Sequence, residues 1–273
     1  MTDYSVLMSV YAKEKPMNLK CAITSMLEQT IPPSDFVLVC DGPIPSGLEK
    51  VIDGFIRKNE GLFQVIRIKE NKGLGIALAT GMRYCKCNMV ARMDSDDIAL
   101  ANRMELQLSL FTKDPSLSVV GGQIQEFFES MDAKGGKRIV PLTPDQIKKA
   151  AAKRNPMNHV TVVFKKNDVE AAGGYIGLDR FEDYFLWARM LAKGFKFANI
   201  EEICVYVRVN NAMYQRRGGW RYFLQTVKLE KYLKTLKIAT EQQYIKNVFV
   251  RFCGTVVTPN FARKYIYSIL LRK

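Results

Sequence analysis

The stretch Met89-Val90-Ala91-Arg92-Met93-Asp94-Ser95-Asp96-Asp97 places three carboxylates directly after an apolar run. Residues 89–93 predict a buried strand that brings these acids to a sheet edge. Carboxylates packed this closely repel one another and are costly to desolvate, so a divalent cation or a polyhydroxy ligand among them would explain the arrangement. Their hard oxygen atoms suit Mg²⁺ or Mn²⁺. A surface turn with a helix N-cap is the alternative, because Asp is common there.

Short apolar runs alternate with helical patterns along the chain. Runs typical of buried strands occur at residues 6–10, 36–39, 65–68, 89–93, 117–120 and 160–164. Apolar residues spaced by three and four indicate helices at residues 17–28, 48–58 and 75–84. This alternation predicts an α/β fold with a parallel, helix-flanked sheet. Downstream, we expect a helix at residues 183–193 and strands at 195–200 and 203–207.

Ligands of such sheets bind beyond the carboxyl ends of the strands, where several candidate site residues fall. Tyr11 follows the first predicted strand, Asp41 the second and Asp94 the fourth. These three side chains could hold a uridine by hydrogen bonding and by stacking. Asp96, with Asp97, could hold a cation that bridges a diphosphate.

A transfer of a sugar also needs a base, because a hydroxyl is a poor nucleophile until its proton is removed. Asp183, in Phe181-Glu182-Asp183-Tyr184, is the candidate. It lies at a predicted helix start, where the helix dipole favours an ionised carboxylate. The residues therefore indicate one nucleotide-sugar site with an electrophilic and a basic half.

These segments, in this order and spacing, resemble the motifs of one enzyme family. Residues 4 to about 210 resemble the inverting glycosyltransferases of family two, which have the GT-A fold, a Rossmann-like and mostly parallel sheet flanked by helices. The matching segments are Ser5-Val6-Leu7-Met8-Ser9-Val10-Tyr11, Ser25-Met26-Leu27-Glu28-Gln29-Thr30, Val39-Cys40-Asp41-Gly42, Asn71-Lys72-Gly73-Leu74, Asp94-Ser95-Asp96-Asp97 and Glu182-Asp183-Tyr184 leading into Leu186-Trp187.

The resemblance implies a role for each matching acid. Asp41 would contact uracil, the segment from Asp94 to Asp97 would bind ribose and a metal-bridged diphosphate, and Asp183 would be the base. Transfer would invert the configuration at the anomeric carbon, giving a β-linked product from an α-linked UDP-glucose, UDP-galactose or UDP-N-acetylglucosamine. The acceptor would be a lipid-diphosphate-linked saccharide in O-antigen, capsule or exopolysaccharide synthesis.

Four more residues are expected around this site. Lys72 would contact the donor nucleotide, and Glu182, His159 and Trp187 are candidate contacts of the acceptor or of the diphosphate. His159 lies in Asn155-Pro156-Met157-Asn158-His159-Val160-Thr161, which resembles a segment of enzymes that build bacterial surface polysaccharides. A structural hydrogen bond is the alternative role for this histidine.

Two departures from the family pattern narrow the expected activity. Cys40 stands where many members have another Asp, so base recognition would depend on Asp41 alone. Processive synthases carry a Gln-x-x-Arg-Trp motif and membrane-spanning helices, and Gln215-Arg216-Arg217-Gly218-Gly219-Trp220 does not match that motif. We therefore expect one sugar to be added per binding event.

Positive charge is concentrated at the end of the chain. Residues 206–273 contain 14 Lys or Arg and two acids, and so carry +12 of the formal net charge of +14. We expect a catalytic domain at residues 1–207, with a nucleotide-sugar half at about 1–100 and an acceptor half at about 101–207, and a basic helical segment at 208–273. Its first helix is either a solvated surface packed on the catalytic domain or a site for an anionic partner. A final helix from Thr258-Pro259 would lie at an anionic membrane surface.

Other sequence features indicate the compartment. The six cysteines lack C-x-x-C spacing and the chain has a single histidine, which argues against structural zinc. The start, Met1-Thr2-Asp3-Tyr4, does not resemble a secretory signal, and no apolar stretch approaches the roughly 20 residues of a spanning helix. We therefore expect a cytoplasmic protein that is peripheral at the inner face of the cytoplasmic membrane.

Competing classes fit less well. A dinucleotide site is disfavoured because Gly73-Leu74-Gly75 lacks the third glycine, and a calcium loop from Asp94 fails at Ile98 and Ala99. A magnesium-dependent nucleotidyltransferase or phosphatase stays open, as does a nucleic-acid- or membrane-binding protein that uses the basic tail. The pair Glu182-Asp183 and the uridine-site residues favour the glycosyltransferase.

Overall fold

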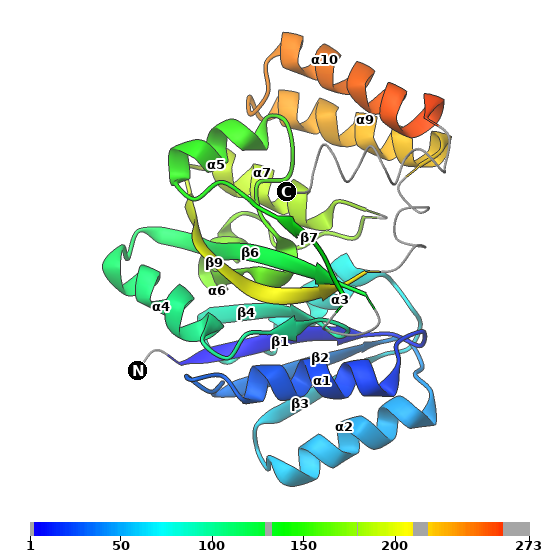
Figure 1. The fold of residues 1–273 in the computed structure, drawn as a ribbon, viewed down its shortest axis with the longest axis vertical. Helices are drawn as coiled ribbons and strands as arrows, with labels where there is room; N and C mark the ends of the chain where they lie inside the picture. Colours follow the sequence, from blue (N-terminus) through cyan, green and yellow to red (C-terminus); the bar gives the residue numbers. More distant parts are fainter. Residues whose placement is uncertain (1–2, 129–132, 179, 210–217, 259–273) are drawn as a thin grey trace.

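The first half of the computed structural model alternates strands and helices as expected (Figure 1). The structure describes residues 3–128, 133–178, 180–209 and 218–258. The first elements are β1 (Tyr4–Val10), α1 (Pro16–Leu27), β2 (Asp35–Asp41), α2 (Ser46–Lys58), β3 (Phe63–Ile68), α3 (Leu74–Met82) and β4 (Met89–Asp94). The strands pair in parallel in the order β3-β2-β1-β4. Their carboxyl ends therefore share one edge of the sheet.

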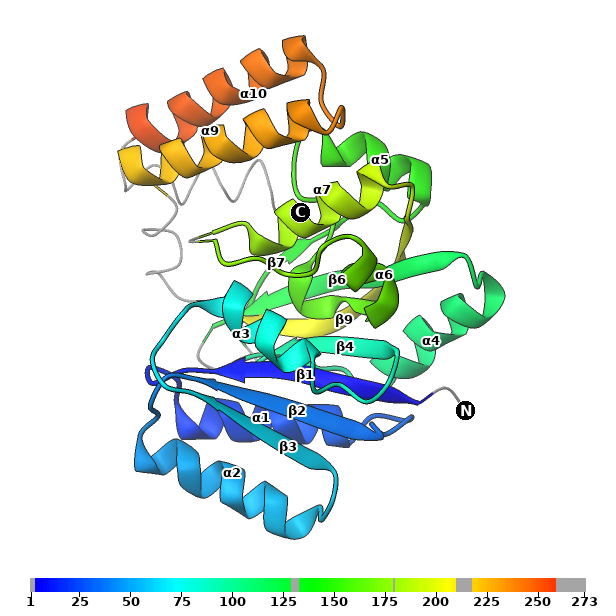
Figure 2. The same cartoon turned by 180° about the vertical axis from the view of Figure 1, so that it is seen from behind.

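This part of the sheet is buried on both faces, which explains the unbroken apolar runs in its strands. Val6 and Met8 of β1 join the core that contains α1 and α2, whereas Leu7 joins the core that contains α3 on the opposite face (Figure 2). Gly81 lets α3 approach the sheet closely, because a Cβ atom there would lie 2.5 Å from Cδ1 of Leu7.

The second half adds antiparallel pairing to the sheet. Its elements are β5 (Ile98–Ala99), α4 (Arg103–Lys113), β6 (Leu117–Phe127), β7 (Lys134–Arg138), α5 (Pro144–Ala151), β8 (Val163–Lys165), α6 (Lys166–Ala171), α7 (Glu182–Ala192) and β9 (Lys196–Arg208). Strand β8 is antiparallel to both β4 and β6, while β6 and β9 run parallel. The described residues thus form one mostly parallel, nine-stranded sheet flanked by helices, which confirms the predicted fold class.

Several details of the second half differ from the expectation. Residues 160–164 are not one strand, because His159–Thr161 forms a 3₁₀ turn before β8. The runs at 195–200 and 203–207 belong to the single strand β9, which shifts its register against β6. The elements β5, β7, α4, α5 and α6 were not predicted from the sequence. Helix α5 does have a local signal, because Thr143 and Gln146 form a capping box at its start.

Two buried polar side chains of α4 hold the end of β4 in place. Arg103 Nη2 donates hydrogen bonds to the carbonyl oxygens of Arg92 at 2.9 Å and Val162 at 3.4 Å. Gln107 Nε2 donates to the carbonyl oxygens of Val120 at 2.9 Å and Thr161 at 2.8 Å. These bonds satisfy buried carbonyl groups where the strands diverge, and so they stabilise the sheet beneath the acidic turn.

Within its described residues, the basic tail contains α9 (Trp220–Thr235), α10 (Glu241–Phe252) and a π-helical turn at Cys253–Val257, and α9 packs on α7 with α10 on its outer side (Figures 1 and 2). Leu229 and Leu233 of α9 form a small core with Tyr184 and Ala188 of α7. Packing on the catalytic domain was one of the two alternatives for this helix. Strand β9 ends at Arg208, next to the expected domain boundary.

A buried carboxylate joins the two tail helices. Glu230 of α9 accepts hydrogen bonds from Asn247 Nδ2 at 2.9 Å and from Arg251 Nε at 3.1 Å, both on α10. The final helix expected from Thr258-Pro259 lies outside the described residues. In the part of the chain that the structure describes, every helix is too short or too polar to cross a membrane.

Candidate active site

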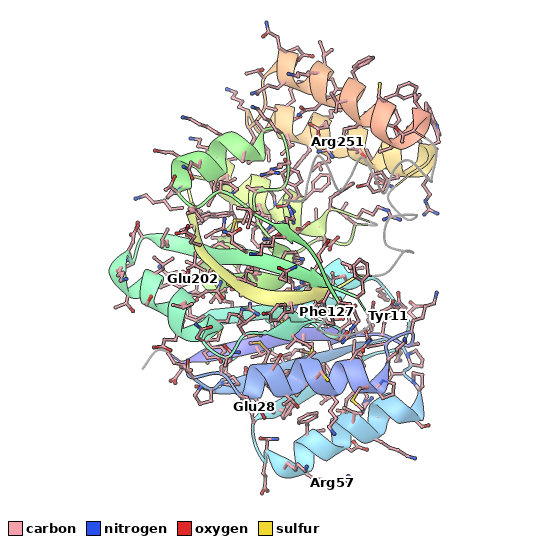
Figure 3. The ribbon with its side chains drawn as sticks, viewed as in Figure 1. Tyr11, Glu28, Arg57, Phe127, Glu202 and Arg251 are labelled. Carbon is pink, nitrogen blue, oxygen red and sulfur yellow. The ribbon has the colours of Figure 1, made fainter. Side chains whose placement is uncertain are left out.

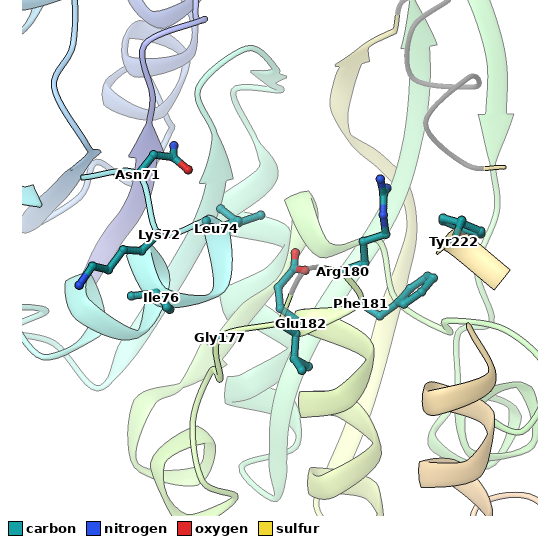
Figure 4. A pocket seen from close by; sticks show the side chains of 11 residues that line it. Asn71, Lys72, Leu74, Ile76, Gly177, Arg180, Phe181, Glu182 and Tyr222 are labelled. Atoms are coloured by element: carbon teal, nitrogen blue, oxygen red, sulfur yellow. The ribbon is translucent and has the colours of Figure 1, made fainter. Parts of the chain in front are cut away.

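A cleft of about 720 Å³ opens between the loop after β3, the loop before α7, and α9 (Figure 4). Asn71 and Lys72 line one wall, Arg180 and Tyr222 line another, and Glu182 also faces the cleft. Segments from both halves of the catalytic domain and from the tail therefore contribute to one cavity.

Asp41 anchors the wall that carries Lys72. Its Oδ1 and Oδ2 accept hydrogen bonds from the backbone N–H groups of Lys72 at 2.8 Å and Gly73 at 2.9 Å. Gly42, at φ +87°, allows the loop to approach, because a Cβ atom there would lie 2.7 Å from the backbone nitrogen of Asn71. Asp41 is only 4% exposed, so its first role is to hold this loop.

The ends of β1 and β4 lie side by side at the same sheet edge. Ser9 of β1 is in register with Asp94, the last residue of β4. Tyr11 follows two residues later and is 39% exposed (Figure 3). The structure thus brings the predicted donor residues Tyr11 and Asp94 to neighbouring strand ends.

Arg92 lies fully buried in β4 beneath the acidic turn. Its Nη1 donates a hydrogen bond to Asp94 Oδ2 at 2.7 Å, and its Nη2 donates to Asp94 Oδ1. Its Nε has no hydrogen-bond partner in the described part of the chain. Burial raises the pKa of Asp96 and of Glu182, and the charge of this guanidinium opposes both rises, so Arg92 acts on the acids of both segments.

The two predicted metal ligands have different surroundings. Asp97 is 2% exposed, and its Oδ1 accepts a hydrogen bond from the backbone N–H of Arg208 at 2.7 Å. Asp96 is half-buried, and burial together with the charges of Asp94 and Glu14 raises its pKa to about 7. Burial, followed by the charge of Asp96, also raises the pKa of Asp97. Among the described residues, no three acidic, histidine or cysteine side chains form a ready metal-binding group.

A second pair of acids, Glu182 and Asp183, forms the first two residues of helix α7. Asp183 Oδ2 accepts a hydrogen bond from Asn155 Nδ2 at 2.6 Å, and Oδ1 accepts one from the backbone N–H of Tyr184 at 2.7 Å. Burial raises the pKa of Asp183, and the bond from Asn155 opposes that rise. Burial and the charge of Asp183 raise the pKa of Glu182 to about 7. Asp94 adds to that rise, so the two acid pairs share one electrostatic environment.

This arrangement of acids at strand ends has a counterpart in a known family. Residues 5–169 match the family model described as Glycosyl transferase family 2. The chain belongs to glycosyl transferase family 2. It is therefore a glycosyltransferase, and the family resemblance stated for its motifs is confirmed.

Relatives of this glycosyltransferase act in bacterial polysaccharide synthesis. The amylovoran biosynthesis glycosyltransferase AmsE of Erwinia amylovora is 38% identical over 241 residues, which cover 88% of this chain and 87% of the relative. The UDP-Gal:alpha-D-GlcNAc-diphosphoundecaprenol beta-1,3-galactosyltransferase of Escherichia coli is 33% identical over 270 residues, which cover 99% of this chain and 97% of the relative.

The fold of this glycosyltransferase is shared with a distant solved enzyme. The mannosyltransferase PcManGT from Pyrobaculum calidifontis, in complex with GDP-Man and Mn²⁺, superposes with a TM-score of 0.63. The match covers 98% of this chain and 79% of that chain at 14% sequence identity. This likeness identifies the GT-A fold.

Two predicted acceptor contacts need revision. Trp187 is fully buried in the core beneath α7, so the expectation that it touches the acceptor or the diphosphate is wrong. His159 Nε2 is hydrogen-bonded to the Tyr175 hydroxyl at 2.9 Å, and its ring packs edge-on against Trp187. Burial and the charge of Arg92 hold the pKa of His159 well below its ordinary value. This neutral histidine matches the structural alternative.

Four residues of this glycosyltransferase site were not predicted from the sequence: Arg92, Asn155, Arg180 and Tyr222. Arg92 was recognisable as a charge inside an apolar strand, and Asn155 lay in a segment already singled out for His159. Tyr222 carried no local signal, because only the packing of α9 brings it to the cleft.

The acid pairs make the stability of the enzyme depend on pH. Because folding raises the pKa of Asp96 to about 7, the folded protein binds more protons than the unfolded chain between about pH 4 and 7, and stability falls as pH rises through that window. We expect Asp96→Asn to raise the free energy of unfolding by about 0.5–2 kcal/mol at about pH 8, and by much less at about pH 4.5. Denaturant titrations at both pH values measure the difference.

Exposed Glu60 provides the matched control for loss of a carboxylate. Glu60→Gln should not raise the free energy of unfolding in a way that depends on pH. If Asp96→Asn raises the free energy of unfolding equally at both pH values, the electrostatic explanation is contradicted.

Proposed function

We propose that this glycosyltransferase moves one sugar from a UDP-sugar, with inversion, to a hydroxyl of a lipid-diphosphate-linked saccharide. The observation that carries the proposal is the placement of two acid pairs, Asp94 with Asp96 and Glu182 with Asp183, around buried Arg92. One pair suits a diphosphate with its cation, and the other suits an alcohol that must lose a proton. The name of the E. coli relative has the same classes of donor and acceptor.

The donor would bind at the shared strand edge. Tyr11 offers an exposed ring for the base, and the oxygens of Asp41 each keep acceptor capacity beyond the backbone bond they already make. Lys72 would bring its positive charge close to the phosphates, and Asp94 would accept hydrogen bonds from the ribose hydroxyl groups. The transferred sugar would be glucose, galactose or N-acetylglucosamine, and the printed name of the E. coli relative specifies UDP-Gal.

A divalent cation, Mn²⁺ or Mg²⁺, fits the acidic turn. Burial is the main cause of the raised pKa of Asp96, and the like charges of Asp94 and Glu14, which a cation would offset, add to it. Asp96 would hold the metal, and Asp97 would complete its carboxylate surroundings while its bond to Arg208 keeps the turn in place. Magnesium is usually held by one or two carboxylates together with substrate phosphates. When bound, the cation would offset the charge of the departing UDP.

Asp183 would act as the base. The acceptor oxygen would form the new bond to the anomeric carbon while the bond from that carbon to the UDP oxygen breaks, so that the electron pair leaves with UDP. The proton of the acceptor hydroxyl would pass to Asp183. The hydrogen bond from Asn155 and the charges of Arg138 and Arg92 favour the ionised carboxylate that this step requires.

A membrane surface would present the lipid-linked acceptor. The exposed parts of the tail helices combine positive charge with large apolar side chains, a pairing typical of anionic membrane interfaces. Trp220 is 58% exposed and Phe249 is 67% exposed, and Lys228 and Lys231 lie on the exposed side of α9. We propose peripheral association with the cytoplasmic leaflet.

The membrane proposal predicts a loss of vesicle binding when charge is reversed. Lys228→Glu combined with Lys231→Glu should weaken co-sedimentation with phosphatidylglycerol vesicles by about tenfold or more, since each basic residue near an anionic surface contributes about 1 kcal/mol. The same reversal at Arg57 and Lys58 on α2 is the control. Equal vesicle binding by both double variants would refute a role for α9.

The catalytic assignment predicts that donor binding and turnover separate. Asp183→Asn should keep UDP affinity but lower turnover by roughly 10²-fold or more. Asp96→Ala should abolish the Mn²⁺-dependent part of UDP binding, and Asp53→Asn on exposed α2 should change neither quantity. Calorimetric UDP titrations with and without Mn²⁺, and sugar transfer to a synthetic lipid-diphosphate-linked saccharide, give both readouts. Wild-type turnover in Asp183→Asn would remove the base assignment.

Asn155 is predicted to set the pH dependence of turnover. Its loss should raise the pKa of Asp183, so the acidic limb of log kcat against pH should move to higher pH by up to about one unit. The comparison is between wild type, Asn155→Ala and the exposed control Asn167→Ala. A lower kcat with an unmoved limb would mean that Asn155 supports only the local fold.

A further inference from the structure

One wall of the cleft carries Arg180, whose guanidinium packs on an aromatic ring. The guanidinium carbon of Arg180 lies 5.3 Å from the centroid of the Tyr222 ring, and the Phe181 ring packs on the same tyrosine at 5.5 Å. Within the described residues, Arg180 forms no ion pair with a carboxylate. The aromatic contact therefore orients the guanidinium while its N–H donors stay available to a ligand.

The backbone at Phe181 fixes where this cation points. Phe181 has a φ of +62°, in the left-handed region that bulky residues rarely occupy, and such a conformation persists where the surroundings enforce it. The turn lets both neighbours, Arg180 and Glu182, line the same cleft. Arg180 thus precedes the proposed base, Asp183, by three residues.

The cleft has two basic walls with different origins. Lys72 belongs to the loop that Asp41 anchors at the end of β2, on the side proposed for the donor. Figure 4 shows Lys72 and Arg180 on opposite sides of Glu182. Arg180 therefore lies across the reaction centre from the donor wall, where the acceptor must approach.

We propose that Arg180, held against Tyr222, binds the diphosphate of the lipid-linked acceptor. The assignment rests on the proposed function, which supplies an acceptor with a diphosphate next to its first sugar. A guanidinium presents paired N–H donors that match phosphate oxygens, and an arginine that forms no ion pair among the described residues is suited to such an anion. The donor diphosphate would instead be bound through the cation proposed at Asp96.

This proposal gives the basic tail a role inside the site. Tyr222 belongs to α9, so the tail completes the acceptor wall as well as covering α7. Trp220, the first residue of α9, is exposed and packs on Phe223 and Phe252. The lipid chain would leave the diphosphate along this side of α9, towards the membrane.

Two matched acceptors test the assignment. One carries N-acetylglucosamine α-linked through diphosphate to a long alkyl chain, and the other carries the same sugar attached to the alkyl chain by a neutral glycosidic oxygen. Each is assayed with UDP-glucose, UDP-galactose and UDP-N-acetylglucosamine. The ratio of kcat/KM for the two acceptors should fall about tenfold or more in Arg180→Gln, because a charged hydrogen bond to phosphate is lost.

Further variants separate binding from folding. Tyr222→Leu should also reduce the ratio, whereas Tyr222→Phe should keep it, since the ring holds Arg180. Arg57→Gln on α2, at the opposite end of the molecule from α10 (Figure 3), should leave the ratio unchanged. UDP affinity should stay within about twofold of wild type in Arg180→Gln.

Three outcomes would overturn the assignment. If Arg180→Gln weakens UDP binding but keeps the ratio of kcat/KM for the two acceptors, Arg180 binds the donor diphosphate instead. A wild-type enzyme that uses both acceptors equally would refute the diphosphate subsite while leaving sugar transfer to a saccharide in place. If wild type binds UDP with Mn²⁺ but uses neither acceptor with any donor, the proposed function itself fails.

Discussion

The site depends on one buried cation, the guanidinium of Arg92. A charge inside a parallel strand is tolerated only if nearby acids compensate for its lost hydration, and Asp94 accepts two hydrogen bonds from this guanidinium. The acids in turn depend on Arg92, because Asp96 and Glu182 would repel their neighbours even more strongly without it. Arg103 holds the carbonyl oxygen of Arg92 from below, so the core of the sheet supports the electrostatics of the site.

The cleft combines segments that fold for different reasons. On one side of the cleft, two hydrogen bonds that Asp41 accepts hold the loop that carries Lys72 in place. On the other side, a left-handed turn at Phe181 positions the residues before α7. The third wall belongs to α9, whose apolar face packs on α7 and whose Glu230 is satisfied by α10. The tail therefore contributes to the cleft, and in the proposed function its charge, its exposed apolar residues and Tyr222 would serve a lipid-linked acceptor.

Local patterns predicted the first half of the fold well and the second half poorly. Through β4, each strand contains a largely apolar run and each helix has a clear period, because both faces of a parallel sheet must be covered. Strand β7 instead reads Lys134-Gly135-Gly136-Lys137-Arg138, and β5 has two residues; both exist through pairing with distant strands. Strand propensity is weak evidence where the partner supplies the stability.

The sequence by itself determined the α/β alternation, the acids at the strand ends and Asp183 at the start of a helix, since each follows from neighbouring residues. Tertiary structure alone decided that Asp97 is bound by Arg208, that Trp187 is buried, and that Tyr222 reaches the cleft. The physical reason is distance along the chain. Asp97 and Arg208 are 111 residues apart, and they meet only because β5 pairs with β9.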